Sequence, residues 1–328
     1  MQVLRFTRPG GPEVLDFEER PAPTPGPSDL LVRVHATALN RADLLQIRGG
    51  YPAPPGVPSD VPGLEYAGEV IATGPLARRF KPGDRVMGLV GGGAFAEQLI
   101  THEREALPLP ENLDFASAAA LPEAYLTAFD ALVLQGGLRM GESVLIHAVA
   151  SGVGSAAAQI CRALGARSLG TGRNAEKLSR APAWGVEKTV LCDAPPRFAE
   201  AVREATGGRG VDVALDLVGG DYLPETLRAM APQGRVLLVG LVAGRQALTD
   251  LDVLLTRRLR VTGTVLRSRP PEEKMALTQA AERSLLPLFR AGTLTPVVDA
   301  VYPMREAREA LARMASNDTV GKLVLRWE

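Results

Sequence analysis

The sequence predicts an α/β fold of two domains, a β-rich domain and a doubly wound parallel sheet. Two observations predict it. The first part is rich in Pro and Gly and carries short strand-like runs, and the later part alternates apolar helices with β-branched strands. A length of 328 residues also favours two domains, because one core of that size normally splits. We expect the β-rich domain at 1–122 and 267–328 and the parallel sheet at 123–266.

The first part is expected to form a compact, partly closed β-domain. Its strand-like runs are separated by turns and lie at 30–36, 67–72, 85–89 and 95–101. The end of the chain is expected to return to this domain, through a long helix at 271–291 and a final strand at 322–326.

The second part alternates strictly between strands and helices, which calls for parallel strands joined by right-handed crossovers. No repeat or low-complexity linker is visible, so we expect structured helices to join the domains and a cleft to lie between them. The predicted strands are 143–148, 168–171, 189–192, 213–217, 235–239 and 260–265, and the predicted helices are 155–164, 175–184, 198–206 and 222–230.

The composition excludes partners that bind through charge. Hydrophobic residues make up 46% of the chain, charged residues 23%, and the formal net charge is zero. Nucleic acid and anionic membranes require clustered excess Lys and Arg, and we interpret the short groups Arg257–Arg258 and Arg267–Arg269 as solvated surface. No segment resembles a signal peptide or a spanning helix. We expect a cytoplasmic protein with no nucleic-acid or membrane partner.

One strand runs into a glycine turn and then a helix, the arrangement that binds a dinucleotide pyrophosphate in a Rossmann domain. Here the turn departs from Gly-x-Gly-x-x-Gly, because Val149 and Ser151 stand at the first two glycine positions and Gly154 alone is kept, with Gly152 between them. The alternative is a tight strand-to-helix turn without a ligand.

The end of the next strand decides the cofactor. An Asp or Glu there would bind the adenosine ribose of NAD. The segment 171–174 has no carboxylate, and Arg173 with Lys177 can bind the ribose phosphate of NADP. We therefore predict NADPH, the alternative being that Arg173 is an ordinary solvated residue.

The expected ligands of a catalytic zinc are missing. Enzymes that polarise an alcohol with zinc hold it through Cys and His, but Asn40 and Leu64 stand where these ligands would be, and His35, His102 and His147 are scattered. Without a Lewis acid, hydride passes more readily to a quinone or an activated alkene than to a ketone. We interpret Glu65 and Asp84 as structural groups that pair with donors in turns, and Cys161 and Cys192 as buried apolar residues.

Several motifs in order carry a family resemblance. The chain resembles the zinc-free quinone oxidoreductases of the medium-chain dehydrogenase/reductase superfamily over essentially its full length, and the loop at 151–154 and the segment 48–55 resemble the branch of the tumour-suppressor-inducible NADPH quinone oxidoreductase. The resemblance implies a GroES-like catalytic domain beside the Rossmann domain. The matching segments are Asn40–Leu44, Gly63–Val70, Lys81–Val86, Gly91–Glu97, Ala120–Phe129 and Gly321–Leu325.

The resemblance also implies a set of site residues, in which Asn40 and Tyr51 line the nicotinamide side and act in catalysis. Asn40 could also serve only as a helix cap, and Tyr51 only as a loop anchor. The implied cofactor-binding residues are Asn40, Tyr51, Thr127, Ser151, Gly152, Val153, Gly172, Arg173, Lys177, the main chain of Gly240, Leu241, Leu266 and Arg267, and finally Asn317 and Lys322.

Two further expectations follow from the resemblance. A homodimer would form through the edge of the Rossmann sheet at 261–266. Relatives commonly have a Tyr on the adenine side where this chain has Cys192, so adenine packing is expected to be weaker here.

The sequence thus predicts a zinc-independent NADPH:quinone oxidoreductase that holds its quinone in the interdomain cleft. Hydride or single electrons would pass to the quinone, and Tyr51 would hydrogen-bond its carbonyl oxygen. Two alternatives stay open: an NADPH-dependent 2-alkenal or enone reductase, and a crystallin-like protein that binds NADPH with little turnover. A short-chain dehydrogenase is disfavoured, because Tyr125 is not followed by Lys at the required spacing.

Overall fold

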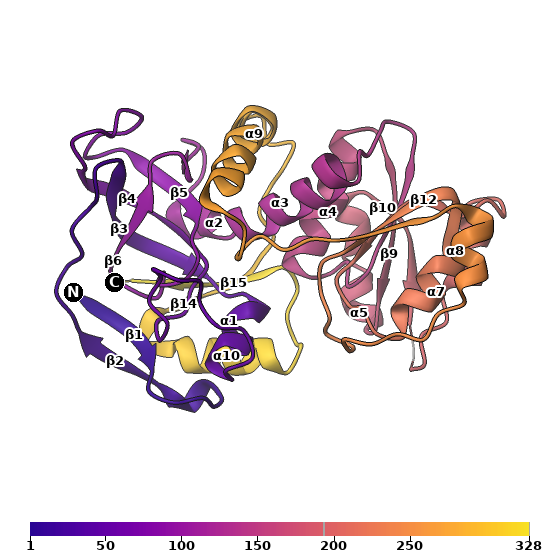
Figure 1. Ribbon diagram of the computed structural model, residues 1–328, viewed down its shortest axis with the longest axis horizontal. Helices are drawn as coiled ribbons and strands as arrows, with labels where there is room; N and C mark the ends of the chain where they lie inside the picture. The colour runs from indigo at the N-terminus through magenta and orange to yellow at the C-terminus, as the bar shows by residue number, and fades with distance from the viewer. Residues whose placement is uncertain (193, 328) are drawn as a thin grey trace. The chain divides into compact units, whose positions relative to one another are not determined.

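The computed structural model describes residues 1–192 and 194–327, which form two compact units (Figure 1). Unit 1 comprises residues 1–126 and the chain from 266 onward, and unit 2 comprises residues 127–265. Unit 1 is β-rich and unit 2 contains a parallel sheet, so the predicted fold class is confirmed. In the described part of the chain, no helix combines the length and apolarity needed to span a membrane.

Unit 1 is built on a seven-stranded, mostly antiparallel sheet in the order β14-β15-β3-β4-β5-β7, with β6 also paired to β3. The returning strand β15 lies antiparallel to β3, so the end of the chain completes the first domain. A separate two-stranded sheet is formed by β1 (Gln2–Phe6) and β2 (Leu15–Glu19). The strands of the large sheet are β3 (Asp29–Ala38), β4 (Glu65–Thr73), β5 (Arg85–Leu89), β6 (Gln98–His102), β7 (Ala106–Pro108), β14 (Val298–Pro303) and β15 (Lys322–Arg326).

Helices of different length pack on the strands of unit 1, with α2 against β3 and β4, α9 against β7, and α10 against β14 and β15. In α1, Leu44 and Ile47 are spaced three residues apart and both belong to the buried core cluster that also contains Phe95 and Leu311, each contributing roughly 1.5–3 kcal/mol through burial. This packing fixes the start of the loop that carries Tyr51. The helices are α1 (Arg41–Ile47), α2 (Phe115–Ala119), α9 (Pro271–Arg290) and α10 (Ala307–Ala315), and α3 (Pro122–Phe129) continues into unit 2.

Unit 2 is a six-stranded parallel sheet in the order β10-β9-β8-β11-β12-β13. The strand order reverses between β8 and β11, and ligands of such sheets bind at the carboxyl ends of the strands beside that point. The strands are β8 (Ser143–Ile146), β9 (Arg167–Gly172), β10 (Val186–Leu191), β11 (Val211–Asp216), β12 (Met230–Leu238) and β13 (Arg260–Gly263).

The helices of unit 2 pack on its sheet. Helix α4 lies on β8 and β9, whereas α7 and α8 lie on β12 (Figure 1). The predicted single helix at 175–184 is wrong, because the chain forms α5 and then a separate 3₁₀ turn at Ala181–Trp184, where Pro182 has no N–H to continue a helix. The helices are α4 (Gly152–Ala163), α5 (Ala175–Leu178), α6 (Ala199–Ala205), α7 (Tyr222–Ala229) and α8 (Leu251–Arg257), with a π-helical segment at Asp130–Gln135.

Candidate functional site

The glycine turn of unit 2 has the geometry of a pyrophosphate cradle. Ser151 is the N-cap of α4, and its Oγ accepts a hydrogen bond from the Gly154 N–H at 3.1 Å. A Cβ on Gly154 would lie 2.5 Å from the Ala148 carbonyl oxygen, so glycine alone lets the helix approach the strand this closely. The amides of Gly152 and Val153 begin the helix and have no intrahelical acceptor, and they stand at its positive end.

His147 holds the strand beneath this turn in place. It is fully buried, with Nδ1 2.8 Å from the Thr171 hydroxyl and Nε2 2.8 Å from the Thr226 hydroxyl. Burial lowers its pKa to about 4, so the ring is neutral at pH 7. These contacts tie the end of β8 to β9 and α7, and the prediction of a structural role is confirmed for this histidine.

The end of β9 presents basic side chains without a carboxylate. Arg173 is exposed, and Asn174 caps α5 by accepting a hydrogen bond from the Lys177 N–H at 3.0 Å. Gly172 immediately precedes Arg173 and ends the strand. The segment therefore offers a guanidinium and a helix start to an anionic group, as the NADP prediction requires.

Two further groups at this side of unit 2 fit a dinucleotide. The Thr127 hydroxyl is buried and has no hydrogen-bond partner among the described residues. A Cβ on Gly240 would lie 2.4 Å from the Leu217 carbonyl oxygen, so the chain after β12 runs tightly along β11. An unpartnered buried hydroxyl costs free energy unless a ligand or water satisfies it, which suits the expected carboxamide contact of Thr127.

The expected adenine side contains an aromatic ring that the sequence analysis did not consider. Tyr222 begins α7 and lies near Cys192, and its ring centroid is 5.6 Å from that of Phe198. Burial and the neighbouring Cys192 raise the pKa of Tyr222 to about 12, although Arg173 has a weaker effect that lowers it. Its phenol is therefore neutral at all ordinary pH values. Its position at the start of a helix after Gly219–Gly220 was the available signal.

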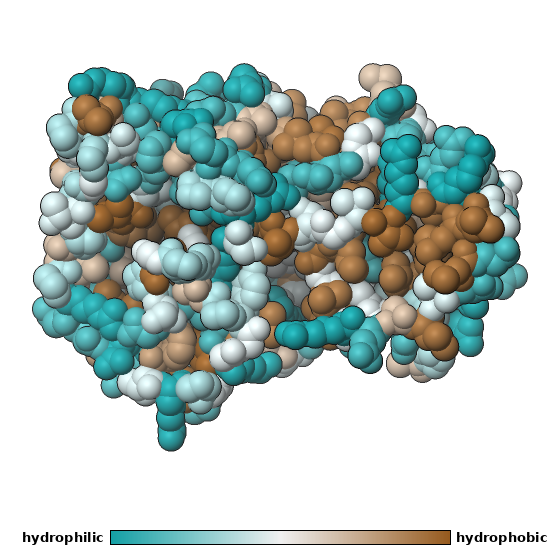
Figure 2. Space-filling view, viewed as in Figure 1, coloured by the Kyte–Doolittle hydropathy of each residue, from teal (hydrophilic) through white to brown (hydrophobic). Residues whose placement is uncertain are grey.

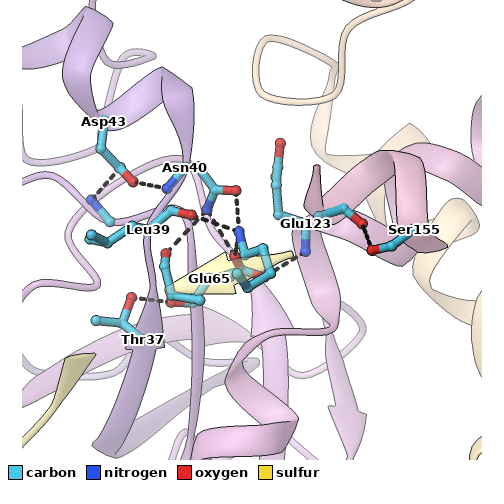
Figure 3. Close-up of polar contacts among 11 residues, drawn as sticks. Thr37, Leu39, Asn40, Asp43, Glu65, Glu123 and Ser155 are labelled. Carbon is cyan, nitrogen blue, oxygen red and sulfur yellow. Dashed lines mark hydrogen bonds and ion pairs between the residues drawn. The ribbon is translucent and has the colours of Figure 1, made fainter. Parts of the chain in front are cut away.

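In unit 1, a network of hydrogen bonds surrounds Glu65 (Figure 3). Its Oε1 accepts from Asn40 Nδ2 at 2.8 Å and pairs with Lys322 Nζ at 2.7 Å, and its Oε2 accepts from the Glu123 N–H at 2.8 Å. Lys322 Nζ also donates to Asn40 Oδ1 at 2.5 Å and to the Leu39 carbonyl at 2.8 Å. The interpretation of Glu65 as a group that pairs with nearby donors in turns is wrong, because its donors come from the N-cap of α1, the start of α3 and strand β15, which are distant in sequence.

Asn40 is largely committed to this network. Its two amide hydrogens go to Glu65 and to the Ala38 carbonyl, and its Oδ1 already accepts from Lys322. The side chain can accept one further hydrogen bond and can donate none. Asn40 is also the N-cap of α1, with its N–H bonded to Asp43, whose pKa is raised to about 6 by burial.

Arg267 is buried, and the prediction that it belongs to solvated surface is wrong. Its side chain is 6% exposed and donates to the carbonyls of Gly91 and Tyr51 and to the side chain of Gln46. Its guanidinium carbon lies 4.8 Å from the centroid of the Tyr51 ring. Composition could not indicate this, because the acceptors come from α1, from the loop that follows it and from the loop after β5, all distant in sequence from Arg267. Asp84, by contrast, accepts from Lys81 in a turn as predicted.

The structure divides the predicted site residues between the two units. Unit 1 contains Asn40, Tyr51, Leu266, Arg267, Asn317 and Lys322, and unit 2 contains Thr127, Ser151, Gly152, Val153, Gly172, Arg173, Lys177, Gly240 and Leu241. Of these, Asn317 has a left-handed backbone conformation with φ of 60°, and its side chain accepts a hydrogen bond from Arg41.

Among the residues that the structure describes, no three His, Cys, Asp or Glu side chains are grouped to hold a metal ion.

Comparison with known proteins gives the family. The family model for an alcohol dehydrogenase GroES-like domain matches residues 26–111, and that for a zinc-binding dehydrogenase matches residues 152–282. A quinone oxidoreductase of Pseudomonas aeruginosa is 35% identical over 327 residues, which is 98% of each chain.

Solved structures similar to this chain indicate the same family. A quinone oxidoreductase of Pseudomonas syringae pv. Tomato has a TM-score of 0.88 at 32% identity, and a mycobacterial protein complexed with NADPH has a TM-score of 0.87 at 29% identity, each covering 99% of both chains. The fold is that of oxidoreductases that bind a nicotinamide dinucleotide. The chain therefore belongs to the quinone oxidoreductase family of the medium-chain dehydrogenases and reductases.

Proposed function

We propose that this enzyme is a zinc-independent NADPH:quinone oxidoreductase. The observation that most supports this proposal is the network of hydrogen bonds and one ion pair among Lys322, Glu65 and Asn40. The ammonium group already binds the carboxylate and the amide oxygen, so these side chains form no ligand set for a second cation. An acceptor reduced beside them must then delocalise the incoming charge itself, as a quinone does.

The proposal gives each cofactor-binding residue a part of the dinucleotide to bind. The amides of Gly152 and Val153 bind the pyrophosphate, with Ser151 holding their turn, and Arg173 and Lys177 bind the ribose phosphate. The nicotinamide is framed by Thr127 and by main-chain groups of Gly240, Leu241, Leu266 and Arg267, with Asn317 and Lys322 at its edge. The reduced nicotinamide supplies the hydride.

Tyr51 is the catalytic group that we assign to the acceptor. Burial and the nearby Glu123 carboxyl raise the pKa of its phenol, so the hydroxyl stays protonated and able to donate near pH 7. A hydrogen bond from it to a quinone carbonyl strengthens as negative charge develops on that oxygen. The Asn40 side chain has no free N–H and can only accept a further hydrogen bond, so we assign it the role of fixing the positions of Glu65 and Lys322.

The test follows NADPH absorbance at 340 nm with a panel of quinones and 2-alkenals. We expect quinones to be reduced faster than 2-alkenals, and Tyr51→Phe to lower kcat by about tenfold to a hundredfold because one stabilising hydrogen bond is lost. Fast turnover of 2-alkenals with no quinone reduction would assign the enzyme to the alkene reductases. Tight NADPH binding with no acceptor reduced would point to a binding protein.

The cofactor choice is tested separately with Arg173→Ala. Loss of the guanidinium should weaken NADPH binding by about tenfold or more and leave NADH binding unchanged, since NADH has no ribose phosphate. Lys188→Ala, an exposed position on β10, is the matched control. Equal losses for the two nucleotides would contradict the proposed role.

We also propose that the enzyme is a homodimer joined through β13. This strand ends the six-stranded sheet, and all four of its residues are exposed. Figure 2 shows hydrophobic side chains gathered over the neighbouring α8 region. The segment 241–265, which leads into and out of α8 and β13, is rich in exposed apolar residues, and Leu248 is 94% exposed. An exposed edge and exposed apolar side chains are typical of an interface between identical chains. The other exposed apolar residues of this segment are Leu241, Val242, Leu251, Leu255, Val261 and Val265.

A further inference from the structure

The loop that joins α1 to β4 across 48–64 is held by backbone hydrogen bonds at its two ends, at 48–50 and 60–64. Its middle, 51–59, carries Tyr51 and contains Pro52, Pro54, Pro55 and Pro58, which have no N–H to donate. Among the described residues, the one backbone–backbone hydrogen bond of this middle part runs from the Val57 N–H to the Pro54 carbonyl, so an ordered Tyr51 needs a tether from elsewhere in the fold.

Arg267 supplies these tethers from a distant segment. Its Nη1 donates to the Tyr51 carbonyl at 3.0 Å, its Nε to the Gly91 carbonyl at 2.7 Å, and its Nη2 to Gln46 Oε1 at 2.5 Å. Gln46 in turn donates from Nε2 to the Ser59 carbonyl at 3.1 Å. One guanidinium and its amide partner therefore hold the loop near both of its ends.

The same guanidinium also contacts the Tyr51 ring. The distance of 4.8 Å to the ring centroid is within the range of a cation–π interaction. The guanidinium is buried, so water competes little for these contacts. The ring and the carbonyl of Tyr51 are thus both fixed by one residue, which defines the direction of the phenol.

We propose that Arg267 is a positioning residue that orients the phenol of Tyr51 toward the acceptor. The proposal rests on the proposed function, in which Tyr51 donates to the acceptor carbonyl. Lysine cannot replace arginine here, because an ammonium group lacks the planar fork that reaches three acceptors and stacks on a ring.

The first test is independent of catalysis. Limited trypsin digestion monitors cleavage after Arg48, which is exposed at the start of the loop. In Arg267→Lys, the freed loop should be cut at least about tenfold faster than in the wild type, because cleavage follows the population of the open loop. Arg269→Lys, two residues away, is the matched control and should leave the rate unchanged. Equal cleavage of Arg267→Lys and wild type would overturn the proposal.

The second test separates positioning from general structural support. Arg267→Lys should lower kcat for a quinone by about tenfold, while the Kd for NADPH, measured by fluorescence, stays the same. In Tyr51→Phe the same substitution should add little, because the two residues act through one hydrogen bond. Independent, multiplying losses of kcat would overturn the proposal.

A milder variant guards against misfolding of Arg267→Lys. Gln46→Met removes one acceptor and keeps the guanidinium, and it should produce a smaller change of the same kind in both tests. If the wild type reduced no acceptor, the proposed function would fail, and the protease result would still decide whether Arg267 holds the loop.

Discussion

Lys322 can be buried in unit 1 because oxygens surround its ammonium group. The carboxylate of Glu65, the amide oxygen of Asn40 and the carbonyl of Leu39 accept its three hydrogens. Such a pair adds little net stability over apolar residues, but removing one member leaves the other charged and alone. The network thus fixes the geometry of the site residues.

Lys322→Met is expected to lower the free energy of unfolding by roughly 3–5 kcal/mol, because the Glu65 carboxylate loses its counter-charge in a buried place. Urea denaturation measures this value. The control is Lys81→Met, whose 82% exposed side chain pairs with Asp84 and should contribute about 0–1 kcal/mol. A loss in Lys322→Met no larger than in the control would show that the network does not stabilise the fold.

At this scale the sequence predicted residue types better than their contacts. The family resemblance named Asn40, Tyr51 and Lys322, and the motif around Gly154 predicted the turn. The burial of Arg267 could not be predicted, because its acceptors lie in loops that only the folded chain brings together. Local spacing likewise could not pair Glu65 with Lys322.

Among the elements, the approach of α4 to β8 depends on one missing side chain. Gly154→Val is expected to push the helix start away from Ala148, lowering the free energy of unfolding by about 1–3 kcal/mol and NADPH affinity by at least about tenfold. NADPH fluorescence and urea denaturation measure the two effects. Lys188→Ala, an exposed position on β10 of the same sheet, is the control. Unchanged affinity in Gly154→Val would argue against a cradle at this turn.

The junction of β8, β9 and α7 depends on a neutral histidine. The folded-state pKa of His147, about 4, lies below its ordinary value of 6.5, so the unfolded chain binds more protons between these values. The stability contributed by neutral His147 is complete above pH 6.5 and is lost as the pH falls toward 4.

We therefore predict that wild type loses about 3 kcal/mol more than His147→Gln when the pH falls from 7 to 4. Urea denaturation at a series of pH values gives the difference in the free energy of unfolding between the two proteins. Groups whose pKa is shifted the other way, such as Asp43, contribute equally to both proteins and cancel in this difference. Parallel pH curves for the two proteins would mean that the ring is not buried as a neutral group.

The alternation of strands and helices predicted the parallel sheet because its central strands, β8 and β11, are apolar runs that are almost wholly buried. Helix α8 was not predicted because it is short and only partly buried: Val253 and Leu254 pack against the core of unit 2, whereas Leu251 and Leu255 are exposed, so the sequence shows no clear apolar stripe. The division of the predicted helix at 175–184 depended on one proline, whose effect on a short apolar run is hard to judge from sequence alone.

For the whole molecule, the edge strand β13 and the exposed apolar residues of 241–265 predict assembly. Val261→Lys with Val265→Lys should convert a dimer into a monomer, because two added charges would face each other across the joined edges. Sedimentation velocity measures the mass. Val301→Lys, which adds a charge at an exposed position of unit 1, is the control. A wild-type monomer, or a dimer that persists in the double variant, would remove β13 from the interface.

The proposed function requires this enzyme to pass hydride from NADPH to a quinone without a metal ion. The most direct measurement is the rate of NADPH oxidation with a quinone after exhaustive chelation, with bound metal quantified on the same sample by mass spectrometry. We expect full turnover when the enzyme carries less than about one tenth of an equivalent of any bound metal. Activity that disappears with chelation and returns in proportion to added zinc would contradict it.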